Sequence, residues 1–409
     1  MVHSMWACGD TDCERHGPIA LGRSAMPSLW SAFALFVAFV THVGAFKLDP
    51  VFGRLNSVVD LTGASLALMM VLGIIVVVIR PRLPRPVITD LLVLTVWLFM
   101  LVGCREVVDA YSRVKVATFA VVTLPLYFAA RMLPTHVSET CLPRYLTAIG
   151  LYVQLTGMMF GTWSSDWGGV RLIQGAGANY LSLGYVAGST SVMLWIGQYE
   201  SRASVGRVFL RMMFALSIVV VLLSAARGPL VAVTLCMLLY GFLGRKLSRY
   251  TVISGFFFTV LIAVVARSSI ITPIAGRFAS LAAESGALGM GTRGPLFAAA
   301  IRAIGSTPTG VGTGNFASLM GTVGRDYPHN ILLEVGAENG WIALAAISLL
   351  LARNAHQAVS MIRDEHGTRI ALLFCFALVS AMFSGDINDH RLLWVTVGAM
   401  QRIIGKEAK

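Results

Sequence analysis

Charge is what this sequence has least of. Only 13% of its 409 residues are Asp, Glu, Lys or Arg, whereas a soluble domain carries about 25%. The hydrophobic share is 56%, and several apolar runs reach the ~20 residues that cross ~30 Å of hydrocarbon as a helix. The scarcity of charge excludes an ordinary soluble domain and predicts an all-α integral membrane protein with many spans.

Acidic residues are scarcer than basic ones. The chain holds 20 Asp and Glu against 32 Lys and Arg, which gives a formal net charge of +12. Membrane proteins collect Lys and Arg in their cytoplasmic loops, so this excess is not the footprint of a nucleic-acid partner. We expect the chain to contact membrane lipids and no nucleic acid.

Cysteine is also sparse and scattered. The six cysteines show no disulfide framework, and Cys236 and Cys375 lie inside apolar runs, where a cysteine packs as a small hydrophobic residue. The polar residues 1–26 lack the apolar core of a signal peptide. The two cysteines and two histidines of this stretch match no standard metal spacing, so we predict a cytoplasmic N-terminal tail over 1–26.

Nucleotide and metal motifs are missing as well. The glycines Gly310, Gly312 and Gly314 are followed by no Lys-Ser or Lys-Thr pair and preceded by no strand, so they form neither a P-loop nor a dinucleotide fingerprint. Their spacing favours a tight turn against the membrane surface. The outer loops contain no Asp-x-Asp metal pair, since Asp386 and Asp389 are spaced differently.

The apolar runs predict about twelve transmembrane helices. Nine of them fall within residues 27–267, and three fall within 330–409 ahead of a cytoplasmic C-terminus. Between these blocks, residues 268–329 form one large loop. The predicted spans centre near 27–46, 58–79, 87–103, 115–133, 145–162, 179–198, 208–225, 229–244, 250–267, 330–351, 369–385 and 391–405.

The distribution of Lys and Arg predicts the orientation. With the N-terminus inside, the short outer loops hold fewer Lys and Arg than the inner ones, as the positive-inside rule requires. Both termini are then cytoplasmic, and the 268–329 loop faces outward. The outer set is Lys47, Arg54, Arg105, Arg113, Lys115, Arg171, Arg227 and Arg391.

Ionisable residues concentrate where the large loop re-enters an apolar segment. In the stretch 325–341, Pro328 fits at or just before a first helical turn. A helix beginning there would place Asn330, Glu334 and Glu338, which recur every four residues, on one face. His329 directly precedes that face. An ordinary helix start with a capping Asn and a snorkelling acidic face explains the same pattern.

Three outer arginines run against the orientation bias. Arg171 follows an aromatic-glycine turn, Arg227 sits in a short hinge, and Arg293 precedes an apolar stretch, 296–304, that reads as a helix. A half-buried Arg is expensive unless paired, and a guanidinium binds phosphate bidentately. Snorkelling is the alternative, as is pairing with Asp166, Glu284 or Asp386.

Several stretches together resemble a known family. They are Arg171–Asn179, Ser224–Gly228, Arg293–Phe316 and His329–Gly340, and the closing segment Phe383–Trp394 is also typical. The likeness runs from about residue 30 to about residue 405. In these stretches the sequence resembles the O-antigen ligase and polymerase superfamily of bacterial polysaccharide assembly.

The resemblance implies a GT-C-like membrane glycosyltransferase in the bacterial inner membrane, with its active site facing the periplasm. Its donor would be a glycan on undecaprenyl pyrophosphate, transferred without nucleotide sugar, metal or other cofactor. In the family pattern an outer-loop His is catalytic and outer arginines hold the pyrophosphate. Carried over, these are His329, Arg227 and Arg293, with Arg171 as a further candidate.

The implied chemistry suits these side chains. A His near its reference pKa can take a proton from an acceptor hydroxyl, and fixed arginines can stabilise the departing pyrophosphate. Attack opposite the leaving group would invert the anomeric centre. Asn330, Glu334 and Glu338 would orient His329 or bind sugar hydroxyls, and a helix-packing role explains the two glutamates equally well.

The acceptor separates several functions. A ligase of lipopolysaccharide biosynthesis joins the glycan to a hydroxyl of lipid A-core, whereas a polymerase joins it to a second lipid-linked glycan. A protein acceptor is a third option. A lipid-linked-glycan transporter would favour ionisable residues at mid-membrane and internal repeats, but the charges gather at outer helix ends and no clear repeat is visible.

Overall fold

The computed structural model of the chain describes residues 25–46, 56, 58–79, 84–105, 110–164, 171–173, 180–201, 203–224, 226–244, 293–322 and 326–407. The described part is helical apart from one short hairpin, whose strands β1 (Thr162–Ser164) and β2 (Arg171–Ile173) pair antiparallel. The helices are α2 (Ala25–Phe46), α4 (Leu61–Ile79), α5 (Ile88–Arg105), α6 (Ala110–Thr118), η2 (Phe119–Thr123), α7 (Leu124–Met132), η3 (Val137–Cys141), α8 (Leu142–Phe160), α9 (Tyr180–Glu200), α10 (Ser204–Leu223), α11 (Arg227–Leu243), α14 (Gly294–Ser306), α15 (Phe316–Leu319), α16 (Ile331–Arg363), α17 (Thr368–Ala381) and α18 (Arg391–Glu407).

The helices follow the apolar runs of the sequence. A helix overlaps every predicted span except 250–267, which lies outside the described residues. Five helical stretches are long and apolar enough to cross a membrane, which confirms a multi-pass membrane protein, while the count of twelve spans stays a prediction. These five are Pro27–Gly44, Leu61–Ile79, Ala110–Met132, Ser204–Leu223 and Ile331–Arg363.

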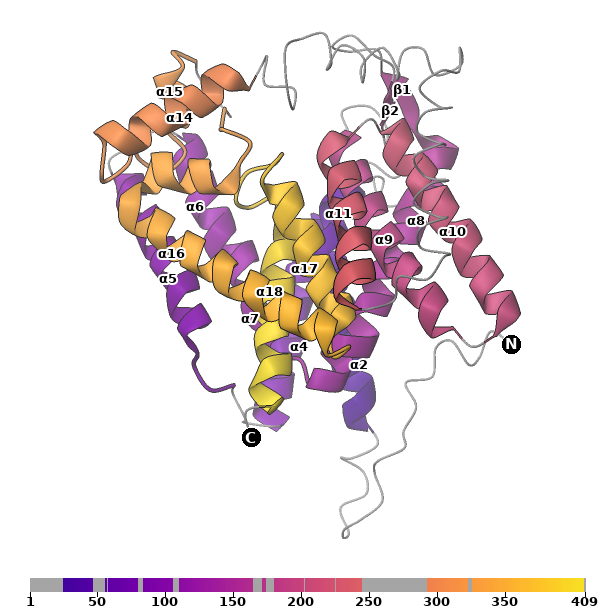
Figure 1. The fold of residues 1–409 in the computed structure, drawn as a ribbon. Coiled ribbons are helices and arrows are strands. Elements are labelled where there is room, and N and C mark those ends of the chain that lie inside the picture. Colours follow the sequence, from indigo (N-terminus) through magenta and orange to yellow (C-terminus); the bar gives the residue numbers. More distant parts are fainter. Residues whose placement is uncertain are drawn as a thin grey trace.

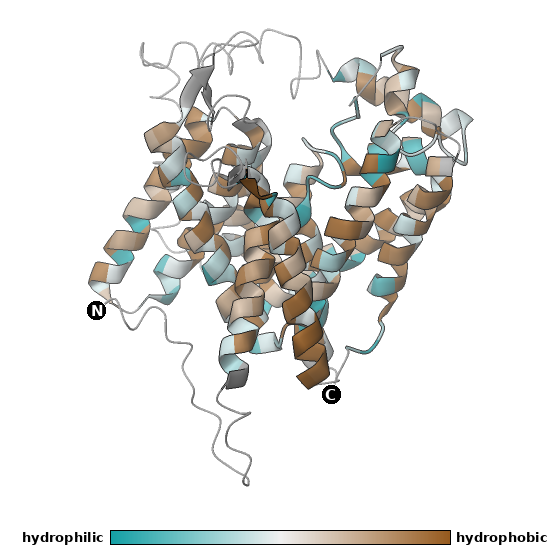
Figure 2. Ribbon diagram, turned by 180° about the vertical axis from the view of Figure 1, so that it is seen from behind, coloured by the Kyte–Doolittle hydropathy of each residue, from teal (hydrophilic) through white to brown (hydrophobic). Residues whose placement is uncertain are grey.

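Most of the helices run side by side as a bundle, and the short helices α14 and α15 lie across one end of it (Figure 1). The β1–β2 hairpin lies at that same end, whereas α18 finishes at the opposite one. Hydrophobic residues dominate the sides of the bundle (Figure 2). On α4 alone, Leu68, Val71, Ile74 and Val78 are exposed. Large exposed apolar surfaces of this kind face lipid in a membrane protein.

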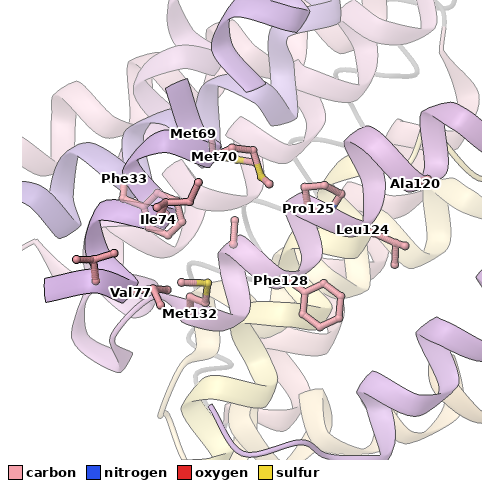
Figure 3. A pocket seen from close by; sticks show the side chains of 13 residues that line it. Phe33, Met69, Met70, Ile74, Val77, Ala120, Leu124, Pro125, Phe128 and Met132 are labelled. Carbon is pink, nitrogen blue, oxygen red and sulfur yellow. The ribbon is translucent and has the colours of Figure 1, made fainter. Parts of the chain in front are cut away.

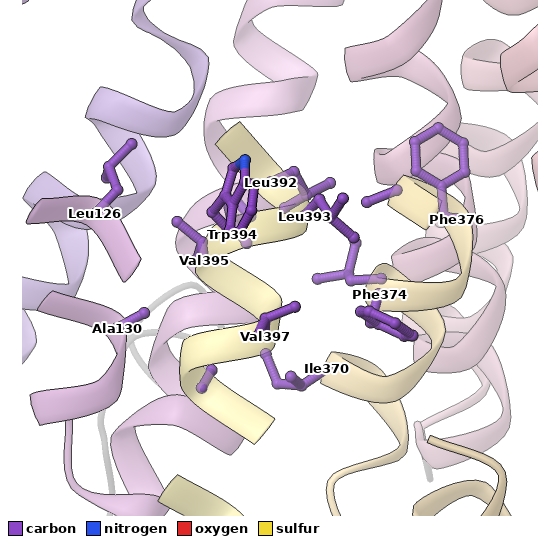
Figure 4. Close-up of a cluster of buried hydrophobic side chains, with 14 of the residues drawn as sticks. Leu126, Ala130, Ile370, Phe374, Phe376, Leu392, Leu393, Trp394, Val395 and Val397 are labelled. Carbon is purple, nitrogen blue, oxygen red and sulfur yellow. The ribbon is translucent and has the colours of Figure 1, made fainter. Parts of the chain in front are cut away.

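One part of the hydrophobic core lies between α7, α17 and α18 (Figure 4). Phe374, Phe376 and Trp394 are fully buried there. The Trp394 ring packs edge-on against Phe119, with the ring centroids 5.3 Å apart, a favourable arrangement for aromatic pairs. The indole N–H of Trp394 donates to the carbonyl of Ile387 at 3.0 Å. Through this hydrogen bond, the buried Trp394 anchors the loop between α17 and α18 to the core.

The helical stretch 110–132 is not a plain α-helix. Its middle segment η2 is a π-helix, in which the Leu124 N–H bonds to the Phe119 carbonyl five residues back. Pro125 follows directly and has no N–H to donate, and the wider turn accommodates that missing bond. The second π-helix, η3, likewise precedes a proline, Pro143. Both π-turns therefore have a local cause in the sequence.

Helix α16 breaks at Gly340. The glycine has φ 80° and ψ −174°, a backbone conformation that other residues rarely adopt. The first part of α16, residues 331–339, therefore lies across the end of the bundle, and residues 341–363 turn down along it (Figure 1). We call residues 331–339 the interfacial arm.

The glycine-rich segment 307–315 fills the break. The Val311 and Gly312 N–H groups donate to the carbonyls of Ala337 and Glu338, and the Trp341 N–H donates to the Pro308 carbonyl. These bonds satisfy backbone groups that a broken helix leaves without partners. The sequence predicted a tight turn here, and the structure shows that it packs on α16.

Replacing Gly340 with Ala should destabilise the fold. A Cβ at this position would lie 2.3 Å from the Pro308 oxygen, at a φ of +80°. We expect a loss of about 1–3 kcal/mol from the backbone strain alone, seen as a lower midpoint of thermal unfolding in detergent.

Gly305→Ala is the matched control. Gly305 lies in α14, and an added Cβ meets nothing within 4 Å, so this change should leave the midpoint unchanged or raise it. Equal midpoints for the two variants would contradict the role assigned to Gly340.

Candidate functional site

The interfacial arm begins with a capped turn. Asn330 is the N-cap, and its side-chain oxygen accepts hydrogen bonds from the N–H groups of Leu332 and Leu333 at 3.0 and 3.1 Å. Its amide also donates to the Met382 carbonyl at 3.3 Å. The predicted helix start is therefore confirmed, and the cap ties it to the segment that follows α17.

His329, the predicted catalytic residue, sits just before this cap in a strained conformation. Its φ is 56°, a left-handed value that few residues other than glycine adopt. The Tyr327 ring packs beside its imidazole, with the centroids 4.4 Å apart. A residue held in such a conformation needs surroundings that fix it, and such residues cluster at functional sites.

The environment keeps His329 neutral. Burial lowers the pKa of His329 from 6.5 to about 4, and the positive charge of Arg293 adds to this, while Asp326 opposes it. Its Nδ1 atom is buried and makes no hydrogen bond within the part of the chain that the structure describes. At neutral pH the ring is therefore an uncharged imidazole with a proton-accepting nitrogen.

Arg293 and His329 adjoin the same backbone segment, since Asn330, next to His329, donates to Met382 and Arg293 donates to the adjacent Phe383. Arg293 is half-buried at the start of α14, and its guanidinium donates to the carbonyl of Phe383. This bond holds the guanidinium against the backbone that follows α17. The structure thus brings together two of the residues that the resemblance assigns to the site, Arg293 and His329.

Arg227 and Arg171 are less completely described. Arg227 opens α11 and Arg171 opens β2, but both side chains lie outside the described part. The neighbouring Gly228 packs closely on Phe383, since an added Cβ would meet the Phe383 Cβ at 3.1 Å. The start of α11 therefore lies beside the residue that anchors Arg293.

Glu334 and Glu338 share one face of the interfacial arm, as their spacing predicted. Both side chains contact the Nζ atom of Lys115 at 2.6 Å, and all three side chains are 1% exposed. The three side chains are therefore shielded from solvent between the arm and α6. This geometry supports an orienting or packing role over direct sugar contact.

The predicted position of Lys115 is wrong. It was expected in a short outer loop, but it lies within α6 and is buried. An isolated Lys at the edge of an apolar run was the available signal, because a charge at membrane depth is expensive unless paired. Its partners could not be named, because they lie more than two hundred residues away along the chain.

The loop after α17 joins this network. The Ile387 N–H donates to Glu334 Oε1 at 3.3 Å, and the Asn388 amide donates to the Lys115 carbonyl at 2.9 Å. The Tyr111 hydroxyl donates to Asp386 at 3.0 Å. Three segments distant in sequence, namely α6, the interfacial arm and the 382–390 loop, therefore meet at Lys115.

Two other features do not belong to the site. Within the described ranges no group of three or more His, Cys, Asp or Glu is arranged to hold a metal ion, and metal independence stays a prediction. An apolar groove of about 400 Å³ lies between α2, α4 and α7, lined by residues such as Phe33, Met69, Ile74 and Phe128 (Figure 3). Its lining carries no ionisable side chain, so it suits a hydrocarbon chain rather than chemistry.

These features define a multi-pass membrane protein with His329 and Arg293 at one end of a helix bundle. A neutral imidazole beside a guanidinium can accept a proton while an anion is stabilised. The family model for O-antigen ligase matches residues 212–348, a segment that contains Arg227, Arg293 and His329. This match supports the O-antigen ligase and polymerase superfamily, as the sequence resemblance predicted. A sequence search of curated proteins finds no match to the chain.

Proposed function

We propose that the protein is an O-antigen ligase-like glycosyltransferase. It transfers a glycan from undecaprenyl pyrophosphate to a hydroxyl of lipid A-core, a step of lipopolysaccharide biosynthesis. One observation carries this proposal: a neutral, strained His329 lies beside Arg293 inside the segment that matches the O-antigen ligase family. The reaction needs a base and a cation for a phosphate leaving group, and these two residues supply them.

In the proposed reaction, His329 takes the proton of the acceptor hydroxyl as its oxygen attacks the anomeric carbon of the donor glycan. The bond between that carbon and the pyrophosphate oxygen breaks, and the electron pair leaves with undecaprenyl pyrophosphate. Arg293 binds this leaving group together with Arg227 and Arg171, which stabilises the charge as it develops. Attack opposite the leaving group inverts the anomeric centre.

The site faces the periplasm in this proposal, and both termini are cytoplasmic in the bacterial inner membrane. The excess of Lys and Arg in the opposite loops supports that orientation. The start of α2 and the end of α18 lie at the end of the bundle away from α14 (Figure 1). The periplasm supplies no ATP, so the energy comes from the pyrophosphate linkage already on the donor.

A polymerase that joins lipid-linked repeats would use the same residues, because only the acceptor differs. The surface glycan of a deletion strain, on a gel that resolves lipid A-core from its glycan ladder, separates the two. Loss of a ligase leaves bare lipid A-core while donor-linked polymer persists. Loss of a polymerase instead leaves lipid A-core carrying a single repeat.

His329→Ala should lower the transfer rate by about 10²–10⁴-fold, because it removes the base. In the wild type, kcat/KM should fall only as the pH drops through about 4, where the imidazole becomes protonated. This limb reflects burial and the charges of Arg293 and Asp326. The Tyr327 ring packs beside the imidazole.

His366→Ala is the control, since His366 is half-buried and paired with Glu139 on the inner-loop side of the predicted topology. It should leave transfer unchanged. A wild-type limb near pH 6.5, or full activity of folded His329→Ala protein, would contradict the assignment.

Arg293→Lys and Arg227→Lys should each raise the KM for the donor by about tenfold, because lysine lacks the bidentate fork. Arg302→Lys is the matched control, since Arg302 is exposed on the same helix as Arg293. Donor titration of the purified enzyme measures the effect. Wild-type KM values in both lysine variants would show that these arginines only snorkel.

Saturating EDTA should leave turnover unchanged, and nucleotide sugars or ATP should not raise it. The reason is that arginine, rather than a bound cation, meets the charge of the leaving group. Purified enzyme in detergent with donor and acceptor provides the assay. Loss of product on chelation, restored by Mg²⁺ or Mn²⁺, would overturn this part of the proposal.

A further inference from the structure

Lys115 is the point at which three separate parts of the chain are joined. Its Nζ atom contacts one oxygen of Glu334 and one of Glu338, both at 2.6 Å, and its carbonyl accepts from Asn388. The second oxygens, Glu334 Oε2 and Glu338 Oε1, are buried and have no hydrogen-bond partner among the residues the structure describes. The two carboxylates therefore depend on one ammonium group.

Loss of that ammonium group would leave two uncompensated carboxylates in an apolar bundle. A buried charge without its partner is strongly unfavourable, so the carboxyl groups would take up protons or move towards water. In either case the arm loses the ion pairs that hold it against α6. Both carboxyl groups lie on the interfacial arm, which is a single body of nine residues that ends at the Gly340 break. Movement of the arm would carry Asn330 and His329 with it, because Asn330 caps its first turn and His329 directly precedes the cap.

The same ammonium group also fixes the loop that holds Arg293. The Ile387 N–H bonds to Glu334, and the Phe383 carbonyl of that loop receives the Arg293 guanidinium. The Met382 carbonyl receives the Asn330 amide. Movement of the arm would therefore disturb the distance between His329 and Arg293 from both sides.

We propose that Lys115 is a positioning residue for glycan transfer, which holds His329 and Arg293 in register through Glu334, Glu338 and the 382–390 loop. This inference rests on the proposed function. Lys115 is 2% exposed and lies behind the arm, so it acts through other residues and does not touch the substrate.

Lys115→Met keeps the length of the side chain and removes its charge. We expect kcat per folded enzyme to fall about 100-fold, as a displacement of roughly 1 Å can cause, while the KM for the donor changes much less. The acid limb of kcat/KM should move upward from about pH 4, because a displaced His329 loses its burial and the facing charge of Arg293, while Asp326 and Tyr327 move with it. A role confined to folding would lower the yield and leave this limb in place.

The triple variant Lys115→Met/Glu334→Gln/Glu338→Gln removes the unpaired charges at nearly constant size. It should recover about tenfold of the lost kcat, because the partners of one network are coupled. If Lys115 acted directly on the substrate, the triple variant would be no better than Lys115→Met. If Lys115→Met does not fold, the triple variant carries the test, with a reduced kcat and a raised acid limb as the expected result.

Arg131→Met is the matched control. Arg131 is also a buried cation paired with a carboxylate, Asp90, at 3.2 Å, and it lies about 24 Å further along the same helical stretch as Lys115. Breaking this pair costs stability as well, but it should leave kcat and the acid limb as in the wild type. Equal effects of the two substitutions would overturn the proposal.

A readout independent of transfer separates this proposal from the proposed function. The rate at which diethyl pyrocarbonate modifies His329, followed by peptide mass spectrometry at pH 7, should rise in Lys115→Met and stay unchanged in Arg131→Met. If the wild type transfers no glycan but His329 shows this pattern, the proposed function fails and the positioning role stands. Unchanged reactivity and unchanged kcat in folded Lys115→Met protein would overturn the positioning role alone.

Discussion

One ammonium group between two carboxylates is the interaction on which the functional end of this protein depends. An ion pair at the surface contributes little, but a pair sealed in an apolar bundle has no water to replace a missing partner. Lys115, Glu334 and Glu338 therefore have to stay together once the chain has folded. Because Lys115 lies on α6 and the two glutamates lie on α16, these ion pairs determine how the two segments pack together.

The broken helix α16 makes this arrangement possible. If α16 continued straight through Gly340, Glu334 and Glu338 would lie on the same straight helix as the apolar residues that follow. The break turns the first nine residues aside, and the glycine-rich segment supplies hydrogen-bond partners for the exposed backbone groups. A helix end, a capped first turn and a buried ionic face are thereby combined in a short arm that carries His329 at its start.

The sequence predicted much of this because the signals were local. Apolar run length located the helices, and the spacing of Asn330, Glu334 and Glu338 located one face. The residues around Arg293 and His329 indicated a candidate site. The burial of Lys115 could not be predicted in this way, because run length does not distinguish a loop cation from one drawn into the bundle by distant carboxylates. The left-handed backbone of His329 and the positions of Arg227 and Arg171 relative to it also depend on tertiary packing.

The π-helix η2 determines where its helical stretch can lose a residue. It separates Lys115, which faces the arm, from Tyr127 and its neighbours, which face α18. Each residue of an α-helix advances about 100° around the axis and 1.5 Å along it. A π-turn absorbs one extra residue, so deleting one residue between Phe119 and Thr123 would restore an ordinary α-turn and leave the two halves in register. The same deletion elsewhere between Lys115 and Tyr127 would rotate one half against the other, so that either the lysine or the core face would point towards lipid.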